Sequence, residues 1–575
     1  MQISRHWARR AVASFLGGTL VVGAAWAGVG LSPHTTAPAS DSTAPKAPGQ
    51  ATAAAAQLNL TAKQAGALTP PDLTPLRENP LDNGLFYVGA DETSIAPDAS
   101  LWQTQGCSEY GSRGAEEATR IIQRLADGKV PPGWPKSDDC VYLGGYGIGP
   151  ARAATGSDPH TPVAVRSIAI SNGTDTVVWQ MVDVVGFFSV YRSDLCNPGC
   201  GILDIREQIS KDTGIPVANV AVGATHTHGG ADGYGAWGGL PDWYRVQLRD
   251  AVVESAYNAL RNVKVASIHT GEVDARNMNS ERRDTYRSSP DYGLVWLQAR
   301  DASGGGNSTG GVIATLVNYA AHPVVLGDQG LMHGDWPATA SQALSQTLGG
   351  TGMVYEGGLG NVSPSSRAPE ADYTGDGTTD DYDEVIQMGR DFAAAVKADI
   401  DRGGHRMPNS VVKAVNSTIS HPSTNMAENG LSFGGLLDRD FLGERAAGGP
   451  GEWHGGKKQT RPCVTASSNT IKTDVSGYRI GDLRVLTAPG EIFSAVSLAI
   501  KSRTGRGDAA NGGQVMVFGQ TQDSLGYIIQ SFEVDPAGGV LTNAGGHVEY
   551  EETFMLDRCF GDHVLEEAIA LAGQL

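Results

Sequence analysis

Two segments of the chain show the alternation of apolar and polar residues that is typical of β-strands. Residues 163–170 and 175–184 have this pattern, and they flank the dipeptide Asn172-Gly173. Asn-Gly favours a tight turn, so the pattern predicts a β-hairpin. Further apolar runs bounded by turn residues predict three more strands. These runs are residues 217–227, 311–319 and 483–487.

Longer segments with apolar residues three and four positions apart predict helices. They are residues 201–213, 242–262 and 383–402. After residue 487, Pro489-Gly490 is expected to end the strand, and a helix is expected to begin at Glu491. Strands and helices are mixed along the chain, which predicts an α/β or α+β architecture.

The N-terminus has the features of a secretory signal peptide. Three arginines lie within the first ten residues, an apolar or small stretch follows, and Ala25-Trp26-Ala27 matches a cleavage site. We therefore expect residues 1–27 to be a signal peptide. A transmembrane anchor is the alternative, but the stretch is short and interrupted by glycine. Residues 28–80 are rich in Ala, Pro and Thr and predict a flexible tether, which leaves residues 81–575 as one large domain.

The composition limits the class of function. The chain has 575 residues, of which 40% are hydrophobic, and a formal net charge of −19. This apolar content suffices for a large core, which excludes disorder along the whole chain. The negative charge argues against nucleic acid as a partner and against strong electrostatic binding to anionic lipid. No apolar span follows the signal peptide, so we expect no transmembrane segment in the mature chain.

An even number of cysteines in an exported chain predicts disulfides. The six cysteines allow 15 pairings, which the sequence alone does not distinguish. Cys196 and Cys200 are close enough in sequence to close a small local loop. A metal site at this pair is less favoured, because no second such pair completes a four-ligand site.

The dipeptide repeat Thr225-His226-Thr227-His228 follows a predicted strand and precedes two glycines. Residues two apart in a strand point to the same side, so His226 and His228 share one face. Neutral imidazoles are common zinc ligands, and the pair is therefore a candidate metal site. Two hydrogen-bonded histidines at a strand end are the simpler alternative.

A third histidine, His322, also follows an apolar strand, at Asn318–Pro323. A lone histidine is more often structural, but this position resembles that of His226. His333 and Asp335 lie in the next glycine-containing loop, and they are candidates for ligands or for groups that support ligands. A solvated loop explains them equally well.

Of four other candidates, all but Tyr527 have a simple structural alternative. Ser363 follows a Gly-rich turn, where backbone amides can approach an oxyanion, although a plain Gly/Ser loop fits as well. Glu491 is a candidate carboxylate ligand, and a helix cap is its alternative. Tyr527 lies where a turn enters a strand and has no meaning alone. The acidic residues 372–384 are a candidate calcium site, although a solvated acidic loop is favoured.

Several patches, in this order, resemble the neutral (alkaline, non-lysosomal) ceramidases. They are Phe86-Tyr-Val-Gly-Ala-Asp-Glu, Thr225-His-Thr-His228, His322-Pro-Val, Asn361-Val-Ser-Pro364 and Pro489-Gly-Glu-Ile-Phe493. The resemblance spans residues 86–558, which corresponds to the catalytic domain of that family without its C-terminal β-sandwich domain. It implies a large layered domain of the α/β (mixed α+β) class, with mixed β-sheets flanked by helices.

The resemblance also implies a metal site. His226, His322, Glu491 and Tyr527 match the residues that hold one zinc ion per chain in the family. These ligands are far apart in the sequence, so the fold has to bring them together. Neutral histidines with anionic oxygen ligands and one open position suit a catalytic zinc ion.

Catalytic roles follow from the same resemblance. His228 would act as the acid/base group beside the metal, and Ser363 matches the essential serine of the family. Tyr550 matches a tyrosine thought to polarise the scissile carbonyl. A covalent route through Ser363 is less favoured, because no base and orienting acid are assigned around it.

The sequence departs from the family pattern at two places near these residues. The family has an aspartate two positions before the serine, whereas this chain has Asn361. The family also has an arginine directly after the position of Asn279, and here only Arg282 is a possible replacement. These departures affect the substrate more than the metal site.

The sequence thus predicts a secreted zinc-dependent amide hydrolase. Its expected substrate is the N-acyl bond of ceramide-like lipids, which zinc-activated water would cleave into a fatty acid and a sphingoid base, with transient contact to the membrane surface. Two alternatives remain open: a metallohydrolase of the same fold acting on another N-acyl compound or ester, and a non-catalytic secreted binding protein.

Overall fold

The computed structural model of the chain describes residues 68–97, 101, 107, 139–146, 151–192, 195–196, 199–283, 289–303, 310–327, 330–365, 367–423, 425, 437–439, 470–505, 514–534 and 550–575. The predicted signal peptide and residues 28–67 of the predicted tether lie outside this part. Residues 68–80 lie inside it: they form the short helix α3 (Thr74–Arg77), and the side chains of Leu73 and Leu76 are buried in the core. The predicted boundary at residue 80 therefore falls within a packed segment.

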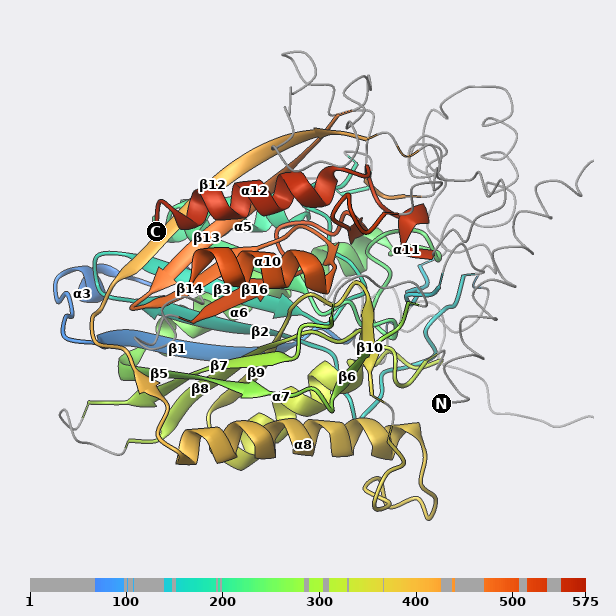
Figure 1. Cartoon of the computed structure of the whole chain (residues 1–575), viewed down its shortest axis with the longest axis horizontal. Helices are drawn as coiled ribbons and strands as arrows, with labels where there is room; N and C mark the ends of the chain where they lie inside the picture. Colours follow the sequence, from blue (N-terminus) through green and yellow to red (C-terminus); the bar gives the residue numbers. More distant parts are fainter. Residues whose placement is uncertain are drawn as a thin grey trace, which may run out of the picture.

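The largest sheet of the described chain has nine strands (Figure 1). Eight follow the order β4-β3-β2-β1-β5-β7-β8-β9, and β11 pairs with β5. These strands are β1 (Leu85–Ser94), β2 (Ala164–Ser171), β3 (Thr176–Val182), β4 (Val220–Ala224), β5 (Lys264–Asp274), β7 (Gly293–Asp301), β8 (Val312–Tyr319), β9 (Thr351–Glu356) and β11 (His405–Arg406). The β3–β4 and β8–β9 pairs are parallel and the other pairs are antiparallel, so the sheet is mixed.

A second, four-stranded sheet packs against the first. Its order is β12 (Val412–Pro422), β13 (Thr470–Ile480), β14 (Leu483–Thr487) and β16 (Val515–Phe518). Two short ribbons complete the strands: β6 (Asn279–Glu281) with β10 (Val362–Pro364), and β15 (Glu491–Ile492) with β17 (Tyr527–Ile528). The ribbon strands carry several of the predicted site residues.

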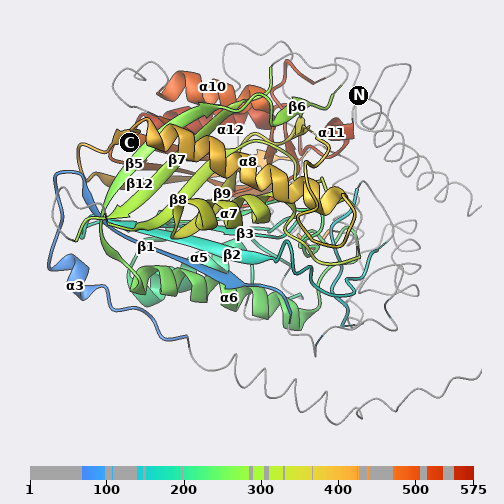
Figure 2. The same cartoon turned by 90° about the horizontal axis from the view of Figure 1, so that it is seen from below.

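Helices cover the outer faces of the two sheets (Figures 1 and 2). The large sheet is covered by α5 (Ile202–Thr213), α6 (Asp242–Arg261), α7 (Asp335–Leu348) and α8 (Asp381–Asp401). The four-stranded sheet is covered by α10 (Ser494–Thr504) and α12 (Phe560–Ala572). The architecture is therefore helix–sheet–sheet–helix, which confirms the predicted large layered domain with mixed sheets flanked by helices. None of the described helices is long and apolar enough to cross a membrane.

The alternation within a strand explains why these layers form. In β2, Val165 and Ala169 face the helices, whereas Ile168 and Ile170 face the second sheet. All eight residues of β2 are buried, because both faces of the sheet are covered. The hairpin before β3 turns at Asn172-Gly173, as predicted, and Gly173 has a φ of 93°, which favours glycine.

Most predicted elements are confirmed. The strand expected over residues 217–227 is shorter, because residues 217–219 form a 3₁₀ turn and β4 ends at Ala224, so His226 and His228 lie beyond the strand. A second correction concerns Glu491. A helix was expected to begin there, but Glu491 and Ile492 form β15 and α10 begins only at Ser494. The backbone N–H of Glu491 donates to the carbonyl of Gly526, 2.8 Å away. This ladder bond to the neighbouring strand holds Glu491 in an extended conformation, and its side chain does not cap α10.

The two edge strands of the large sheet come close together. The hydroxyl of Tyr355 on β9, the last strand in the order, donates to the carbonyl of Gln180 on β3 at 3.1 Å. A side chain at Gly223 on β4 would approach the same hydroxyl to 3.1 Å. The sheet is therefore strongly curved, and its first and last strands face each other.

Residues 519–522, which we call the bridging segment, join these two edges. The N–H of Gly519 donates to the carbonyl of Glu356 at the end of β9, at 2.9 Å. The N–H of Ala224 at the end of β4 donates to the carbonyl of Gln520, also at 2.9 Å. One short segment thus satisfies backbone groups of both edge strands, and it closes the curved sheet at the point where the predicted ligands lie.

Two disulfides lie within the described residues. Cys196 bonds to Cys200, which confirms the predicted local loop, and Cys107 bonds to Cys140. The second disulfide ties residue 107 to the segment that precedes Val141, Tyr142 and Leu143, all buried.

Candidate metal centre

His226 and His322 have the same surroundings. His226 is the second residue after the end of β4 and has a φ of 64°, an uncommon conformation outside glycine. Its Nδ1 donates to the carbonyl of Val185 at 2.6 Å, and Nδ1 of His322 donates to the carbonyl of Leu359 at 2.8 Å. A carbonyl oxygen only accepts hydrogen bonds, so each Nδ1 carries the proton and each Nε2 keeps a lone pair. This arrangement is common for histidines that bind metals.

Both Nε2 atoms point at one carboxylate oxygen. Oε2 of Glu491 lies 3.3 Å from Nε2 of His226 and 3.4 Å from Nε2 of His322. Three lone-pair atoms in contact repel one another unless a proton or a cation lies between them. Two ligands at 2.0–2.1 Å from a tetrahedral zinc ion are separated by about 3.3 Å. The spacing of these three atoms therefore fits a zinc ion.

The charge states of these groups also suit a metal. Burial favours the neutral form of Glu491, but the adjacent His226 and His322 hold the pKa of its carboxyl well below the usual value. Burial and the nearby Arg282 lower the pKa of His322 to about 3. An anionic carboxylate and neutral imidazoles are the forms that bind a divalent cation.

Tyr527 lies beside Glu491. The two residues are directly paired between β15 and β17, and the Tyr527 ring is 6.5 Å from that of His322. The Tyr527 hydroxyl accepts a hydrogen bond from Nη2 of Arg282 at 2.7 Å. Arg282 also donates to Glu551 at 3.0 Å, so the possible replacement for the family arginine reaches the site.

His228 lies next to the pair of candidate ligands. Its ring centroid is 5.0 Å from that of His226 and 5.8 Å from that of His322. One ring nitrogen from each of the three histidines can be chosen so that all three nitrogens lie within 4.8 Å of one another. Burial, followed by the two neighbouring histidines, lowers the pKa of His228 well below its usual value. The imidazole is therefore neutral at neutral pH and faces the candidate metal position.

Ser363 and Tyr550 come from two segments next to the site. Ser363 pairs with Ser280 in the β6–β10 ribbon, and the backbone N–H of His322 donates to the carbonyl of Val362. Ser363 thus directly follows Val362, whose carbonyl binds the backbone of His322. Tyr550 is the first residue of α11 (Tyr550–Thr553), and its side chain lies outside the described residues.

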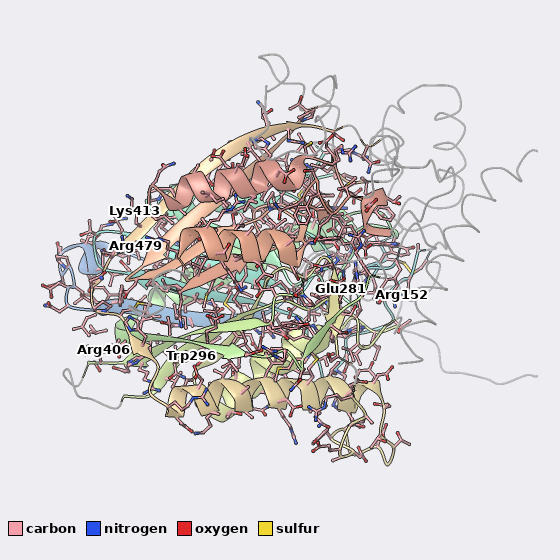
Figure 3. The ribbon with its side chains drawn as sticks, viewed as in Figure 1. Arg152, Glu281, Trp296, Arg406, Lys413 and Arg479 are labelled. Atoms are coloured by element: carbon pink, nitrogen blue, oxygen red, sulfur yellow. A yellow bond between two sulfur atoms is a disulfide. The ribbon has the colours of Figure 1, made fainter. Side chains whose placement is uncertain are left out.

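Asn361 has a structural role. Its Oδ1 accepts the backbone N–H of Ser494 at 2.7 Å, and its Nδ2 donates to Oε2 of Glu281. Asn361 therefore ties the Gly-rich turn to the start of α10 and to β6. Figure 3 shows Glu281 and Arg152 at the same end of the molecule, opposite Lys413, Arg479 and Arg406.

His333 and Asp335 do not join the candidate ligands. Asp335 accepts the backbone N–H groups of Leu326 and Trp336 at 2.9 and 2.7 Å, so it holds its own loop. The ring of His333 packs against Gly229, where any Cβ would lie 2.2 Å from the imidazole. Both residues support the loops that carry His322 and His228.

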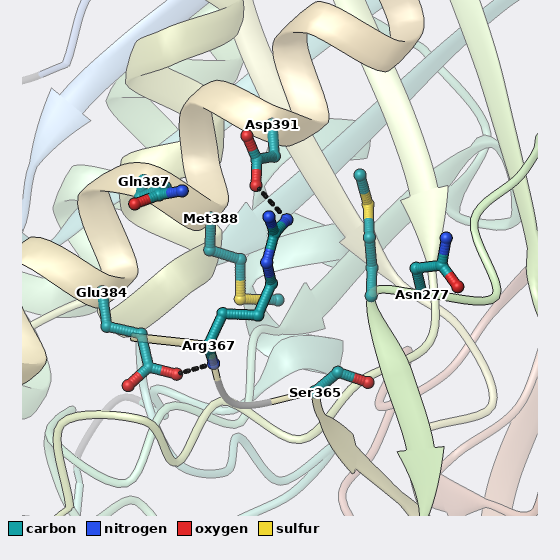
Figure 4. A pocket seen from close by; sticks show the side chains of 8 residues that line it. Asn277, Ser365, Arg367, Glu384, Gln387, Met388 and Asp391 are labelled. Atoms are coloured by element: carbon teal, nitrogen blue, oxygen red, sulfur yellow. Dashed lines mark hydrogen bonds and ion pairs between the residues drawn. The ribbon is translucent and has the colours of Figure 1, made fainter. Parts of the chain in front are cut away.

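The acidic run and a pocket beside α8 lie elsewhere. In residues 372–384, Asp372 accepts the N–H groups of Gly375 and Gly377, so this carboxylate already stabilises its own loop. The pocket in Figure 4 lies beside α8, where Arg367 contacts Glu384 and Asp391. Its lining is Asn277, Met278, Ser365, Arg367, Glu384, Gln387, Met388 and Asp391. None of these is a predicted site residue.

Comparison with known proteins gives matches in structure only. No family model matches the chain, and no curated protein sequence matches it significantly. The chain is similar to the crystal structure of neutral ceramidase from Pseudomonas aeruginosa, with 17% identity and a TM-score of 0.55, over 85% of this chain and 75% of that chain. A ceramidase complexed with C2 matches with 16% identity and a TM-score of 0.54, over 85% and 74% of the two chains.

The chain has the neutral ceramidase fold. The resemblance inferred from short sequence patches is thereby confirmed at the level of the fold. At these identities the match carries no information about individual residues. The case for the metal centre in this ceramidase-like chain therefore depends on its own geometry.

Three features of the site were not anticipated from the sequence. Tyr146 stacks on His228, Trp237 lies behind the same ring, and Gln520 approaches Nδ1 of His226 to 3.2 Å. An isolated tyrosine, tryptophan or glutamine carries no motif. The only signal was the position of Gln520 shortly before Tyr527, in a segment rich in polar residues.

Proposed function

We propose that this protein is a zinc-dependent amide hydrolase that cleaves the N-acyl bond of ceramide-like lipids. The supporting observation is the convergence of Nε2 of His226, Nε2 of His322 and Oε2 of Glu491 at separations of 3.3 and 3.4 Å. Hydrogen bonds of both Nδ1 atoms to backbone carbonyls fix this arrangement. With Tyr527 as the fourth ligand, one zinc ion per chain would be held.

A zinc ion in this position would supply Lewis acidity to the substrate carbonyl and to water. His228, neutral and beside the ligands, would accept a proton from the attacking water and pass it to the nitrogen of the breaking C–N bond. The products are then a carboxylic acid and an amine. Ser363 would bind a hydroxyl of the substrate or the developing oxyanion, and Tyr550 would polarise the carbonyl.

The proposal is tested by metal analysis and hydrolysis on the purified protein. Wild type should contain one zinc ion per chain and release fatty acid from fluorescent ceramide. His226→Ala should lose most of the zinc and the activity, because one of two imidazole ligands is removed. His405→Ala is the matched control, since His405 lies on β11, away from the candidate ligands, and its Nε2 contacts Asp482 at 2.9 Å.

The two variants separate the possible results. Loss of zinc and activity in His226→Ala but not in His405→Ala supports the assignment. Equal zinc content and equal turnover in wild type and His226→Ala would refute it. A wild-type protein that binds no zinc would support a non-catalytic binding protein with this fold.

A different substrate is the second candidate function. Asn361, where the family has an aspartate, accepts a structural hydrogen bond from the backbone of Ser494. The arginine expected after Asn279 is replaced by Ser280. These changes lie next to Ser363, where a substrate headgroup would bind. A panel of ceramides, other N-acyl amines and esters distinguishes the two functions, because all of them require the same zinc site.

We also propose that the protein is secreted and reaches its lipid by transient contact with a membrane surface. Support comes from the sequence of residues 1–27 and from the Cys107–Cys140 and Cys196–Cys200 disulfides, because disulfides form in oxidising compartments. The mature N-terminus of exported protein, determined by mass spectrometry, should lie directly after residue 27.

A further inference from the structure

The His228 imidazole is held differently from its two neighbours. His226 and His322 each donate one ring nitrogen to a backbone carbonyl. Neither nitrogen of His228 has a hydrogen-bond partner among the described residues, although both atoms are buried. A hydrogen bond normally fixes the ring plane and tautomer of a functional histidine. Another contact must therefore fix the ring of His228.

That contact is an aromatic stack. The ring of Tyr146 lies 4.5 Å from that of His228 with an angle of 20° between the planes. Trp237 lies 6.3 Å from the His228 ring at an angle of 44°. A near-parallel stack at this distance is favourable and restricts rotation of the imidazole out of its plane. Because it uses the ring face, it leaves both nitrogens available.

The backbone holds Tyr146 in register with His228. Leu143 forms a β-bridge with Ala231, and the N–H of Gly144 donates to the carbonyl of Gly230 at 2.9 Å. These pairs align residues 142–146 with the loop that carries His228. Backbone pairing thus brings Tyr146 next to His228.

Arg152 links the same two segments from the side. Its Nη2 donates to the carbonyl of Gly144 and, at 3.0 Å, to the carbonyl of His228. Gly145 allows close packing, since a Cβ there would lie 2.6 Å from the Trp237 ring. The Arg152 guanidinium therefore links the segment that carries Tyr146 to the backbone of His228.

We propose that Tyr146 is a positioning residue that orients His228 for proton transfer through ring stacking. This inference rests on the proposed function, in which His228 carries a proton from water to the leaving amine. That step needs an imidazole whose plane is fixed but whose nitrogens are free. The Tyr146 ring supplies the first condition without using either nitrogen, and its hydroxyl is not required.

The test compares Tyr146→Phe, which keeps the ring, with Tyr146→Leu, which keeps apolar volume but removes the ring. Tyr373→Ala serves as a control, because Tyr373 lies in the acidic loop 372–384. We expect kcat to fall about 100-fold in Tyr146→Leu, the scale of a misplaced catalytic group, and only a few-fold in Tyr146→Phe. KM and zinc content should stay close to wild type in all three variants.

Three results would overturn the proposal. One is a Tyr146→Leu protein, folded by circular dichroism, with wild-type kcat. Another is a Tyr146→Phe protein as impaired as Tyr146→Leu, which would assign the role to the hydroxyl. A loss of zinc together with kcat in Tyr146→Leu would also count against it, because the role would then be structural.

A second measurement does not depend on turnover. NMR spectra of protein labelled at its histidine rings, with the His228 signals assigned by His228→Gln, report the ring-current shift from Tyr146. The shift should persist in Tyr146→Phe and disappear in Tyr146→Leu. If wild type hydrolyses no N-acyl substrate, the proposed function fails, and this shift still decides whether Tyr146 orients His228.

Discussion

The imidazole rings of His226 and His322 lie 4.9 Å apart, although β4 and β8, the strands that precede them, are separated by five other strands in the sheet order. The curvature of the sheet and the bridging segment remove this separation. Glu491 and Tyr527 join from a ribbon outside the sheet. The candidate ligands thus connect three parts of the molecule that no single strand pairing links.

Removal of zinc should therefore lower the thermal stability of the whole domain. A ligand that binds only the folded state stabilises it, by about 4 kcal/mol when its concentration is 1,000 times the dissociation constant. We expect dialysis against dipicolinate to lower the melting temperature by several degrees, and added zinc to restore it. The melting temperature of His226→Ala should not respond to either treatment. Calorimetry of both proteins checks this.

Arg282 should support the site through Tyr527. Its guanidinium bonds both the Tyr527 hydroxyl and Glu551, so its loss removes the hydrogen bond that Arg282 donates to the phenol. We expect Arg282→Gln to weaken zinc affinity by 10- to 100-fold, the usual effect of losing a group that orients a ligand. Competition with a fluorescent chelator measures this affinity.

Arg276→Gln provides the matched control, because Arg276 is an exposed arginine whose guanidinium pairs with the neighbouring Asp274. Exposed ion pairs contribute little to stability or to distant sites. Zinc affinity should therefore be unchanged in this variant. An equal loss in both variants would show that the effect of Arg282 is not specific.

Asn361→Asp should destabilise the protein instead of restoring a family feature. Asn361 donates to Glu281, and an aspartate would place two carboxylates in contact there. Losing that donor costs about 1–3 kcal/mol of unfolding free energy. Urea denaturation should show this loss, and adding Glu281→Gln should recover most of it. Simple additivity of the two substitutions would contradict the pairing.

His269 should make the stability depend on pH. Burial first, and then Arg300 and Arg406, lower the pKa of His269 to about 4. The unfolded chain, with an ordinary histidine pKa near 6.5, binds this proton more readily between pH 6.5 and 4. The free energy of unfolding therefore falls as the pH falls through this range.

The expected contribution is modest, because His269 is partly exposed and solvent screens its charge. Between pH 7 and pH 4.5, the free energy of unfolding should fall by about 1 kcal/mol less in His269→Gln than in wild type. Urea denaturation at the two pH values measures this difference. His160→Gln, at an exposed position, should lose as much stability as wild type; identical curves for all three proteins would exclude the effect.

The sequence predicted the parts of the fold that depend on local periodicity. The hairpin around Asn172-Gly173 and the helices α5, α6 and α8 follow from apolar spacing and turn residues. The prediction at Glu491 was wrong because Pro489-Gly490 is typical of both a helix start and a turn into a strand. The hydrogen bond of the Glu491 N–H to Gly526, 35 residues further along, decided between them.

Only those site residues that belong to short sequence motifs could be predicted. His226, His228 and His322 follow strands and could be found individually, and the geometry brings them together. The stack of Tyr146 could not be found, because it depends on the pairing of residues 142–146 with a loop more than 80 positions away. The periodicity of apolar residues predicts a single strand, but it does not indicate which distant loop packs against that strand.

Closure of the sheet by the bridging segment has a consequence for biogenesis. A nascent chain that has built only the N-terminal half of the sheet presents His226 without its partner, and Gly519 and Gln520 are still to be synthesised. Capture of the proposed zinc ion would therefore follow completion of the chain and would not guide its early folding steps. Metal loading would accordingly serve as a late mark of a correctly matured molecule.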